Sequence, residues 1–353
     1  MKNIYLQIPL GAHEISGLVL ATVTGTEGST PQKPGSSALF NQKGLIAGTV
    51  GGGILEGKVQ DLAVKALQSK VPVLDLFMLD NRISNGEDAL CGGKISVLID
   101  PLLSENLPVF KAIRKSAQAR IPGILMTMVT KADDNKVLIS RYWIMETSGK
   151  SIPDILKPVI EPEISSLLAG SDSYDFREIR LPGNGEEPSH VIYLEPVIPA
   201  PRLIIAGAGH IGKALAQIGN MLDFEITVID DRPEFANPEN IPLANHIIAD
   251  DIGKTIRRID KTRDTFIVIV TRGHKDDSNA LKACIDSDAA YIGMIGSKNK
   301  VALMRRDFIE KGWATQELWD KIYTPVGIDI GSKTVEEIAV SIAAQLIQVK
   351  NNK

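Results

Sequence analysis

A glycine-rich turn between two apolar segments constrains the fold of this chain more than any other feature. An apolar run at 203–206 leads into Gly-Ala-Gly-His-Ile-Gly at 207–212, and a second apolar run at 225–229 ends at Asp230. This order is typical of a strand, a phosphate-binding turn, a helix and a second strand, because glycines permit a tight turn and a close approach of backbone to ligand. The helix start would offer free N–H groups to an anion, and Asp230 could accept a hydrogen bond from a ribose hydroxyl.

The sequence around this turn predicts a complete domain of alternating strands and helices. Short apolar runs suited to strands buried on both faces occur at 202–206, 225–229, 246–249, 265–270 and 289–292. Such runs predict five parallel strands. Thr334 and Glu337 form a capping pattern before an apolar helix that we expect to reach Val349. Prolines at 196–201 mark a boundary, so we expect a Rossmann-like, doubly wound parallel sheet over 199–353.

Residues 1–198 have a different pattern, which predicts an α+β domain. The expected strands lie at 18–24, 37–40, 46–50, 73–78 and 95–99. Apolar residues at helical spacing predict a helix from Ile54 to Gln68. We expect a core of about residues 1–104 and an extension over about 105–198, with a helix and a hairpin through Tyr142-Trp143-Ile144.

Composition excludes several classes of protein. Hydrophobic residues make up 44% and charged residues 23% of the 353 residues, and the net charge of −4 argues against nucleic-acid binding. No apolar stretch approaches the length of a membrane span, and the first residues lack the pattern of a signal peptide. The two cysteines, Cys91 and Cys284, do not suggest a disulfide framework. We therefore expect a cytoplasmic protein without a membrane segment.

Three segments of the first half contain residues suited to ligand binding, and the first is the loop 25–35. Its glycines free the backbone and its prolines stiffen it. Ser29, Thr30 and Lys33 supply hydrogen-bond donors, of which Lys33 is cationic. An oxyanion would suit this combination. The alternative is a constrained hairpin loop that binds nothing.

The second segment is Gly51-Gly52-Gly53, which leads into the predicted helix. Unpaired amides and the positive end of the helix dipole would favour a phosphate or a carboxylate there. Close packing of strand against helix is the alternative reason for the glycines. Glu56 could bind the edge of a purine or pterin, or it could complement the helix dipole.

The third segment contains Cys91 beside Gly92 and Gly93. A thiol in such a loop would be accessible to a metal or a sulfur donor, and Lys94 would favour the thiolate. A single cysteine is otherwise a small buried apolar residue. We interpret Cys284 in this second sense, on the apolar face of a helix predicted over 277–286.

The second half offers further candidates at the carboxyl ends of its strands, where open α/β sheets bind ligands. Arg272 could pair with a phosphate, and His274 could act as an acid, a base or a hydrogen-bond donor oriented by Asp277. Alternatively, Asp277 caps the helix and His274 bonds to backbone. His210 could contact a ligand or fill the groove. Candidates for anion binding in the turns are Gly207, Gly209, Gly212, Gly296 and Ser297.

These motifs together resemble the XdhC/CoxI family, the xanthine dehydrogenase accessory factors. In the first half the resemblance lies in Gly28-Ser29-Thr30-Pro31, in 48–53 with Glu56, and in Cys91-Gly92-Gly93. In the second half it lies in 207–212, 230–232, 271–274 with Asp277, 291–297 and 325–331. The motifs cover both domains in order, whereas residues from about 105 to 195 match weakly. Where the family typically has Pro-Ile-Gly-Leu-Asp, this chain has Val326 and Ile328.

The resemblance implies a maturation factor rather than an enzyme that turns over a substrate. Such proteins bind the molybdenum cofactor, a molybdopterin with a terminal phosphate, protect it, assist its sulfuration and deliver it to a xanthine dehydrogenase-type molybdenum hydroxylase. A cysteine desulfurase as sulfur donor and a homodimeric chaperone are further expectations. The glycine-rich turns of the first half would hold the phosphate, and Cys91 would meet soft molybdenum or the transferred sulfur. The Rossmann domain would bind NAD(P) or another nucleotide.

An NAD(P)-dependent oxidoreductase that uses the Rossmann domain is the alternative. Asp230 would favour NAD, and Arg232 leaves some room for a 2′-phosphate. His274 alone is a weak basis for a catalytic site. Xanthine oxidation by this chain itself is not expected, because an iron–sulfur cluster needs four cysteines and the chain has two.

Overall fold

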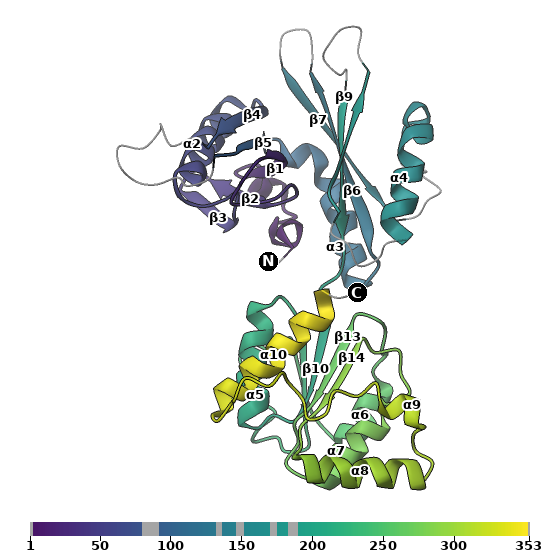
Figure 1. Cartoon of the computed structure of the whole chain (residues 1–353). Coiled ribbons are helices and arrows are strands. Elements are labelled where there is room, and N and C mark those ends of the chain that lie inside the picture. Colours follow the sequence, from purple (N-terminus) through teal and green to yellow (C-terminus); the bar gives the residue numbers. More distant parts are fainter. Residues whose placement is uncertain are drawn as a thin grey trace. The chain divides into compact units, whose positions relative to one another are not determined.

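The computed structural model describes residues 3–79, 92–131, 136–145, 152–169, 175–182 and 190–351. The chain divides into two units, 1–199 and 200–353 (Figure 1). Each unit has its own sheets and its own apolar clusters. Among the described residues, no helix combines the length and the apolar character that a membrane crossing requires.

The sheet of the second unit is parallel throughout. Its order is β12-β11-β10-β13-β14, so the chain adds strands first on one side of β10 and then on the other. The strands are β10 (Arg202–Ala206), β11 (Glu225–Asp230), β12 (His246–Ala249), β13 (Thr265–Ile269) and β14 (Tyr291–Met294). The predicted Rossmann-like parallel sheet is confirmed. Only β14 begins later than expected, because its pairing with β13 starts at Tyr291 opposite Phe266.

Helices cover both faces of this sheet, on either side of the strands in Figure 1. On one face, α5 (His210–Met221) and α10 (Val335–Asn351) share an apolar cluster with the strands. The opposite face is covered by α6 (Ile252–Arg258), α7 (His274–Lys282), α8 (Lys298–Glu310) and α9 (Gln316–Trp319). The strands are apolar on both sides because neither face of the sheet meets water.

The final helix begins with the capping pattern that the sequence predicts. The backbone N–H of Glu337 donates to Thr334 Oγ1 at 3.2 Å, and the N–H of Thr334 donates to Glu337 Oε2 at 3.0 Å. These reciprocal bonds satisfy N–H groups that would otherwise lack a partner. Hydrogen bonds from the backbone of Lys333 and Thr334 also hold the pKa of Glu337 below its ordinary value.

The first unit contains an antiparallel sheet whose described strands follow the order β3-β2-β1-β5-β4. They are β1 (Val19–Glu27), β2 (Ser37–Asn41), β3 (Gly44–Gly48), β4 (Val73–Met78) and β5 (Lys94–Asp100). The helix α2 (Gly53–Ser69) packs on this sheet through Leu55, Val59 and Ala63. The third strand ends before the predicted Val50, because residues 49–52 already form the turn into α2.

A second antiparallel sheet of this unit has the order β7-β6-β9-β8. Its strands are β6 (Gly123–Lys131), β7 (Val137–Ile144), β8 (Arg177–Leu181) and β9 (His190–Val197). Its neighbours are α3 (Leu107–Gln118), which contacts β7, and α4 (Lys157–Ala169), which contacts β6 and β9. Short helical segments complete the described part, namely η1 (Ile4–Gln7), α1 (Ala12–Ile15), η2 (Leu103–Asn106) and η3 (Asp154–Leu156). The predicted β6–β7 hairpin is confirmed, but β8 and β9 were not predicted.

Ionisable side chains lie buried between the two sheets of the first unit. Arg141 of β7 forms an ion pair with Asp100 at the end of β5, and both side chains are almost inaccessible. Glu195 of β9 accepts a hydrogen bond from the Tyr5 hydroxyl at 2.5 Å. Tyr5, Arg141 and Glu195 line a cavity of about 10 Å³ together with Thr22 and other residues of both sheets, which is space for about one water molecule. Among the described residues, none offers a hydrogen bond to Arg141 Nε.

Burial raises the pKa of Glu195 to about 7, against the opposing effects of the Tyr5 hydroxyl and the Arg141 guanidinium. Burial, followed by the proximity of Glu195, also raises the pKa of Tyr5. A side chain in the interior of the first unit therefore changes its charge near neutral pH.

We expect Glu195→Gln to change how stability depends on pH. The folded protein holds the Glu195 proton more tightly than the unfolded chain, so this contribution is complete below pH 4.5 and is lost as the pH rises to about 7. The pKa of Glu195 is 4.5 in the unfolded chain and about 7 in the folded protein, and this difference corresponds to about 3 kcal/mol. Urea unfolding at about pH 5 and about pH 8 should show that the wild type loses more free energy of unfolding than the variant. Parallel pH profiles for the two proteins would contradict this expectation.

Candidate functional site

Three glycine-rich segments of the first unit lie against one another. A side-chain carbon at Gly93 would come within 2.4 Å of the Ser29 carbonyl oxygen. A side-chain carbon at Gly51 would lie 2.7 Å from Pro31 Cγ. The loop 28–31 therefore contacts both the segment before β5 and the turn before α2. Motifs that are far apart in the sequence form one region of the first unit.

The turn at Gly51-Gly52-Gly53 has a backbone that glycine adopts far more readily than other residues. The φ angles are 139°, 69° and 55°, and a side-chain carbon at Gly52 or Gly53 would meet nothing within 4 Å. Gly52 is the N-cap of α2, and no side chain caps this helix start. Consecutive N–H groups in such a turn, at the positive end of a helix, favour an anion. The geometry thus fits a phosphate or a carboxylate.

The loop beside this turn contributes accessible polar groups. Ser29 and Lys33 are exposed, and Lys33 forms no ion pair with any residue in the described ranges. Thr30 is half-buried, and its hydroxyl donates to the Gln32 carbonyl oxygen at 2.9 Å. Ser29 and Lys33 are therefore accessible to an anion, whereas the Thr30 hydroxyl stabilises the loop itself.

Glu56 stabilises the glycine turn from within α2. Thr49 Oγ1 donates to Glu56 Oε2 at 2.7 Å and accepts a hydrogen bond from the N–H of Gly51 at 3.1 Å. The carboxylate also lies in the first turn of the helix, where it complements the dipole. Glu56 was considered either as a ligand for a purine or pterin edge or as a complement to the helix dipole. These contacts support the second role.

Of the two cysteines, the structure describes Cys284 but not Cys91. Cys91 lies outside the described residues, so its role stays a prediction. Nearby, Lys94 pairs with Glu27 at 2.8 Å, and the hydrogen bond from Lys94 lowers the pKa of Glu27. Cys284 is completely buried, and burial raises the pKa of its thiol to about 12. Its interpretation as a core residue is confirmed, although it follows α7, which ends at Lys282.

In the second unit, the glycines of the turn after β10 have three different environments. Gly207 has a φ of 119°, and a side-chain carbon there would lie 2.5 Å from the Val270 carbonyl oxygen. A side-chain carbon at Gly212 would lie 1.9 Å from the Gly207 carbonyl oxygen. At Gly209 it would meet nothing within 4 Å. Two glycines thus permit close packing, and the third leaves open space at the start of α5, as a dinucleotide turn requires.

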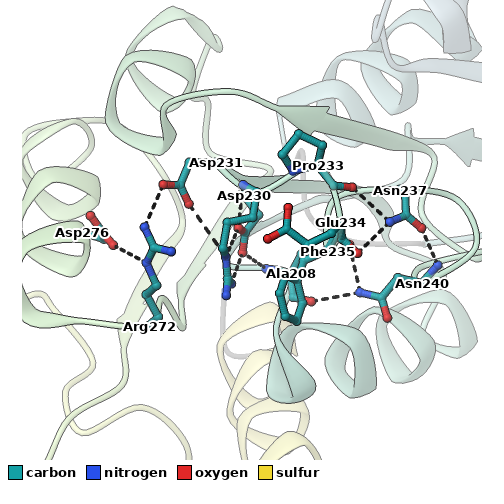
Figure 2. A network of polar contacts seen from close by, with 11 residues as sticks. Ala208, Asp230, Asp231, Pro233, Glu234, Phe235, Asn237, Asn240, Arg272 and Asp276 are labelled. Atoms are coloured by element: carbon teal, nitrogen blue, oxygen red, sulfur yellow. Dashed lines mark hydrogen bonds and ion pairs between the residues drawn. The ribbon is translucent and has the colours of Figure 1, made fainter.

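Asp230 has no acceptor position left for a ribose hydroxyl. Its oxygens accept hydrogen bonds from the N–H of Ala208 at 2.8 Å and from the N–H, Nε and Nη2 of Arg232 at 3.1, 2.8 and 2.9 Å (Figure 2). Although burial opposes ionisation, the bonds from Arg232 and Ala208 hold the pKa of this carboxyl below its ordinary value. The expectation of a direct ribose contact is therefore corrected, because Asp230 fixes the glycine turn and Arg232 instead.

Arg272 is held by carboxylates at the same edge of the sheet. Its Nη2 donates to Asp231 Oδ2 at 3.0 Å, and its Nε lies 3.4 Å from Asp276 Oδ2 (Figure 2). Its side chain is 54% exposed, so a phosphate could reach it. Such a phosphate would compete with the two carboxylates.

Asp277 does not orient His274. Asp277 is buried, and its carboxylate accepts hydrogen bonds from Thr271 and from Lys300 Nζ. His274 is exposed at the first position of α7, as His210 is at the first position of α5. The predicted arrangement is wrong because the carboxylate serves the loop after β13 and ties it to α8.

The turn before α8 has less open space than the turn before α5. Ser297 caps the helix, with its Oγ accepting from the N–H of Lys300 at 3.3 Å. A side-chain carbon at Gly296 would lie 3.2 Å from Val301 Cγ2. Sequence reasoning also missed Lys300, because its partner Asp277 is 23 residues away and no local motif connects them.

In the described ranges, no three His, Cys, Asp or Glu side chains gather in a group that could hold a metal ion.

Comparison with known proteins identifies segments of both units. The family model described as the XdhC Rossmann domain matches residues 203–346, and the one described as the XdhC and CoxI family matches residues 15–77. These matches include the glycine turn after β10 and two of the three glycine-rich segments of the first unit.

Individual relatives match the chain along its whole length. It is 26% identical to the uncharacterized protein YqeB of Escherichia coli over 99% of this chain, and it spans 47% of that protein, about half its length. It is 25% identical to a Bacillus subtilis protein named as a probable xanthine dehydrogenase component, with 99% of this chain and 98% of the relative covered. A crystal structure described as a xanthine dehydrogenase from Bacillus halodurans has 26% identity and a TM-score of 0.77, covering 100% of this chain and 97% of that one.

We expect alanine to destabilise the fold at Gly212 but not at Gly209. Gly212→Ala places a methyl group 1.9 Å from the Gly207 carbonyl oxygen, so it should lower the melting temperature by more than about 5 °C. Gly209→Ala enters open space at an ordinary φ of −71°, so its melting temperature should stay within about 3 °C of wild type. Thermal unfolding measures both variants. Equal destabilisation would show that the space at Gly209 is not open in solution.

Proposed function

Because this chain belongs to the XdhC and CoxI family, we propose that it is an accessory factor of a xanthine dehydrogenase-type molybdenum hydroxylase. It binds the molybdenum cofactor, protects it, assists its sulfuration and delivers it to that hydroxylase. The observation that carries the proposal is the contact among the three glycine-rich segments of the first unit. The Bacillus subtilis relative, which matches over nearly its full length, supports the choice of partner.

The anion-binding turn of the first unit suits the phosphate of molybdopterin. The N–H groups of Gly52 and Gly53 would hold the phosphate oxygens, and Ser29 and Lys33 would add a hydroxyl and a positive charge. The open space at Gly52 and Gly53 permits the close approach that this requires. The cargo supplies the redox chemistry of the partner hydroxylase, while this chain binds, shields and orients it.

The sulfur-handling part of the proposal rests on Cys91. The chain has two cysteines, and Cys284 is buried with a thiol whose pKa is raised to about 12, so it is unsuited to sulfur transfer. Cys91 would meet the molybdenum or receive sulfur from a cysteine desulfurase. The segment that follows it, Gly92-Gly93, packs against the loop 28–31 that borders the anion-binding turn. We further propose that the factor acts as a homodimer.

The second unit, we propose, binds a nucleotide or a nucleotide form of the cofactor without turning it over. Gly209 and Gly273 are the N-caps of α5 and α7, and neither helix start is capped by a side chain. Both helices begin at the carboxyl edge beside β10 and β13, where the strand order reverses. This is the edge at which open α/β sheets bind phosphates.

An NAD(P)-dependent oxidoreductase remains the second candidate, favoured by the same fold. It would need a substrate pocket and an oriented base, and His274 is exposed and not held by Asp277. Steady formation of NADH from a hydroxylated metabolite by this chain alone would favour the oxidoreductase. Anaerobic purification followed by mass analysis of the co-purifying small molecule distinguishes the two candidates.

We expect Gly52→Asp to weaken retention of the molybdenum cofactor by roughly tenfold or more, because a carboxylate would occupy the position of the phosphate. Gly52→Asn is the matched control, since it imposes the same backbone strain at φ 69° without the charge. Molybdenum and pterin content after gel filtration measure retention, and thermal unfolding monitors the fold. Undiminished retention in the Asp variant would count against this binding site. Equal losses in both variants would show that the charge is not the cause.

We expect Cys91→Ala to leave folding intact and to lower sulfuration of the partner hydroxylase several-fold. Cys284→Ala is the control, because it removes a buried thiol and should reduce stability without reducing sulfuration. Cyanide-releasable sulfur on the hydroxylase measures the outcome. Unchanged sulfuration in the Cys91 variant would assign this residue to packing.

A further inference from the structure

The two carboxylates at the end of β11 differ in the hydrogen-bond positions that they leave open to a ligand. Asp230 is 2% exposed and accepts four hydrogen bonds, one from Ala208 and three from Arg232. An ionised carboxylate has about four lone-pair positions, so all of them are occupied. Arg232 is also fixed by packing over the Phe235 ring at 4.0 Å. Asp230 is therefore a positioning residue for the glycine turn.

Asp231 has the accessibility that Asp230 lacks. Its side chain is 42% exposed, and among the described residues only Arg272 donates a hydrogen bond to it, at 3.0 Å. The Arg232 guanidinium lies farther away, with Nε at 4.0 Å. Acceptor positions on Asp231 are thus open to hydroxyl groups of a ligand.

The ion pair between Asp231 and Arg272 crosses the region where a nucleotide would bind. Asp231 follows β11 and Arg272 follows β13, and β10 lies between these two strands in the sheet. The pair, which Figure 2 shows, therefore spans the carboxyl end of β10, and the strand order places it there. Both side chains are about half exposed, and ion pairs of this kind are weak and screened by salt. A phosphate at the helix start could therefore take Arg272 from Asp231.

We infer that Asp231, and not Asp230, binds the ribose hydroxyls of the nucleotide, and that Arg272 leaves Asp231 for the phosphate when the nucleotide binds. This inference rests on the proposed nucleotide binding by the second unit. It assigns the ligand to the class of ribonucleotide diphosphates with free 2′ and 3′ hydroxyls. In the free protein, Arg272 occupies one acceptor position of the ribose-binding carboxylate.

Titration calorimetry with ADP and 2′-deoxy-ADP tests the role of Asp231. The wild type should prefer ADP by roughly tenfold, because loss of the hydroxyl leaves a charged acceptor unpaired. In Asp231→Asn this ratio should fall several-fold, because a neutral amide oxygen accepts a weaker hydrogen bond than a carboxylate. Glu234→Gln is the matched control, because it removes one negative charge from the same exposed loop and should keep the wild-type ratio. Asp230→Asn should reduce stability but keep the ratio in its folded fraction.

Adenosine, which has no phosphate, tests the exchange of Arg272. Arg272→Gln should bind adenosine at least as tightly as the wild type, because the guanidinium that occupies one acceptor position of Asp231 is gone. It should bind ADP several-fold more weakly, because the phosphate loses its charged partner. Equal weakening for both ligands would overturn the exchange.

The remaining outcomes separate this inference from the proposal on which it rests. A wild-type ratio in Asp231→Asn, or loss of the ratio in Asp230→Asn alone, would overturn the assignment of Asp231. Equal affinity of the wild type for ADP and 2′-deoxy-ADP would also overturn it while leaving nucleotide binding intact. A folded wild type that binds neither nucleotide would overturn nucleotide binding by the second unit, and the assignment with it.

Discussion

The hydrogen bond from the N–H of Ala208 to Asp230 is the interaction on which the carboxyl edge of the second unit's sheet depends. It joins the glycine turn to the end of β11, and the same carboxylate fixes Arg232. Asn240 holds the other side of Ala208 by donating to its carbonyl oxygen at 3.2 Å (Figure 2). Because both backbone groups of Ala208 are engaged, the start of α5 is fixed before any ligand arrives. A preorganised turn of this kind avoids the entropic cost of ordering the loop during binding.

Much of the second unit could be predicted because its signals are local. Strands buried on both faces appear as uninterrupted apolar runs, and the Thr334–Glu337 pattern specifies a helix start within four residues. The second sheet of the first unit gave weaker signals. β8 is short and alternates in burial, and β9 contains Pro196, one of the prolines that indicate a domain boundary. Such strands are specified by their partners, which the local sequence does not reveal.

The candidate sites show the same division between local and distant information. The glycines at 51–53 and those at Gly207 and Gly212 were found from sequence, because positive φ angles or close approaches restrict those positions to glycine. The role of Asp230 was not, because the residues that saturate its carboxylate are recognised only in three dimensions. Asp277 and Lys300 were misread or missed for the same reason. Residue type and spacing indicate which hydrogen bonds and ion pairs a side chain can form. Its neighbours in the folded chain decide which of these remain open to a ligand.

The hydrogen bond between Tyr5 and Glu195 has a consequence for how the first unit is made. The two residues are 190 positions apart, and the bond joins η1 to β9 in the interior between the sheets. During synthesis, η1 leaves the ribosome long before β9. This part of the interior therefore cannot close until β9 has also been made. Until then, the apolar residues of η1 and of β2 and β3, which η1 contacts, stay accessible to chaperones.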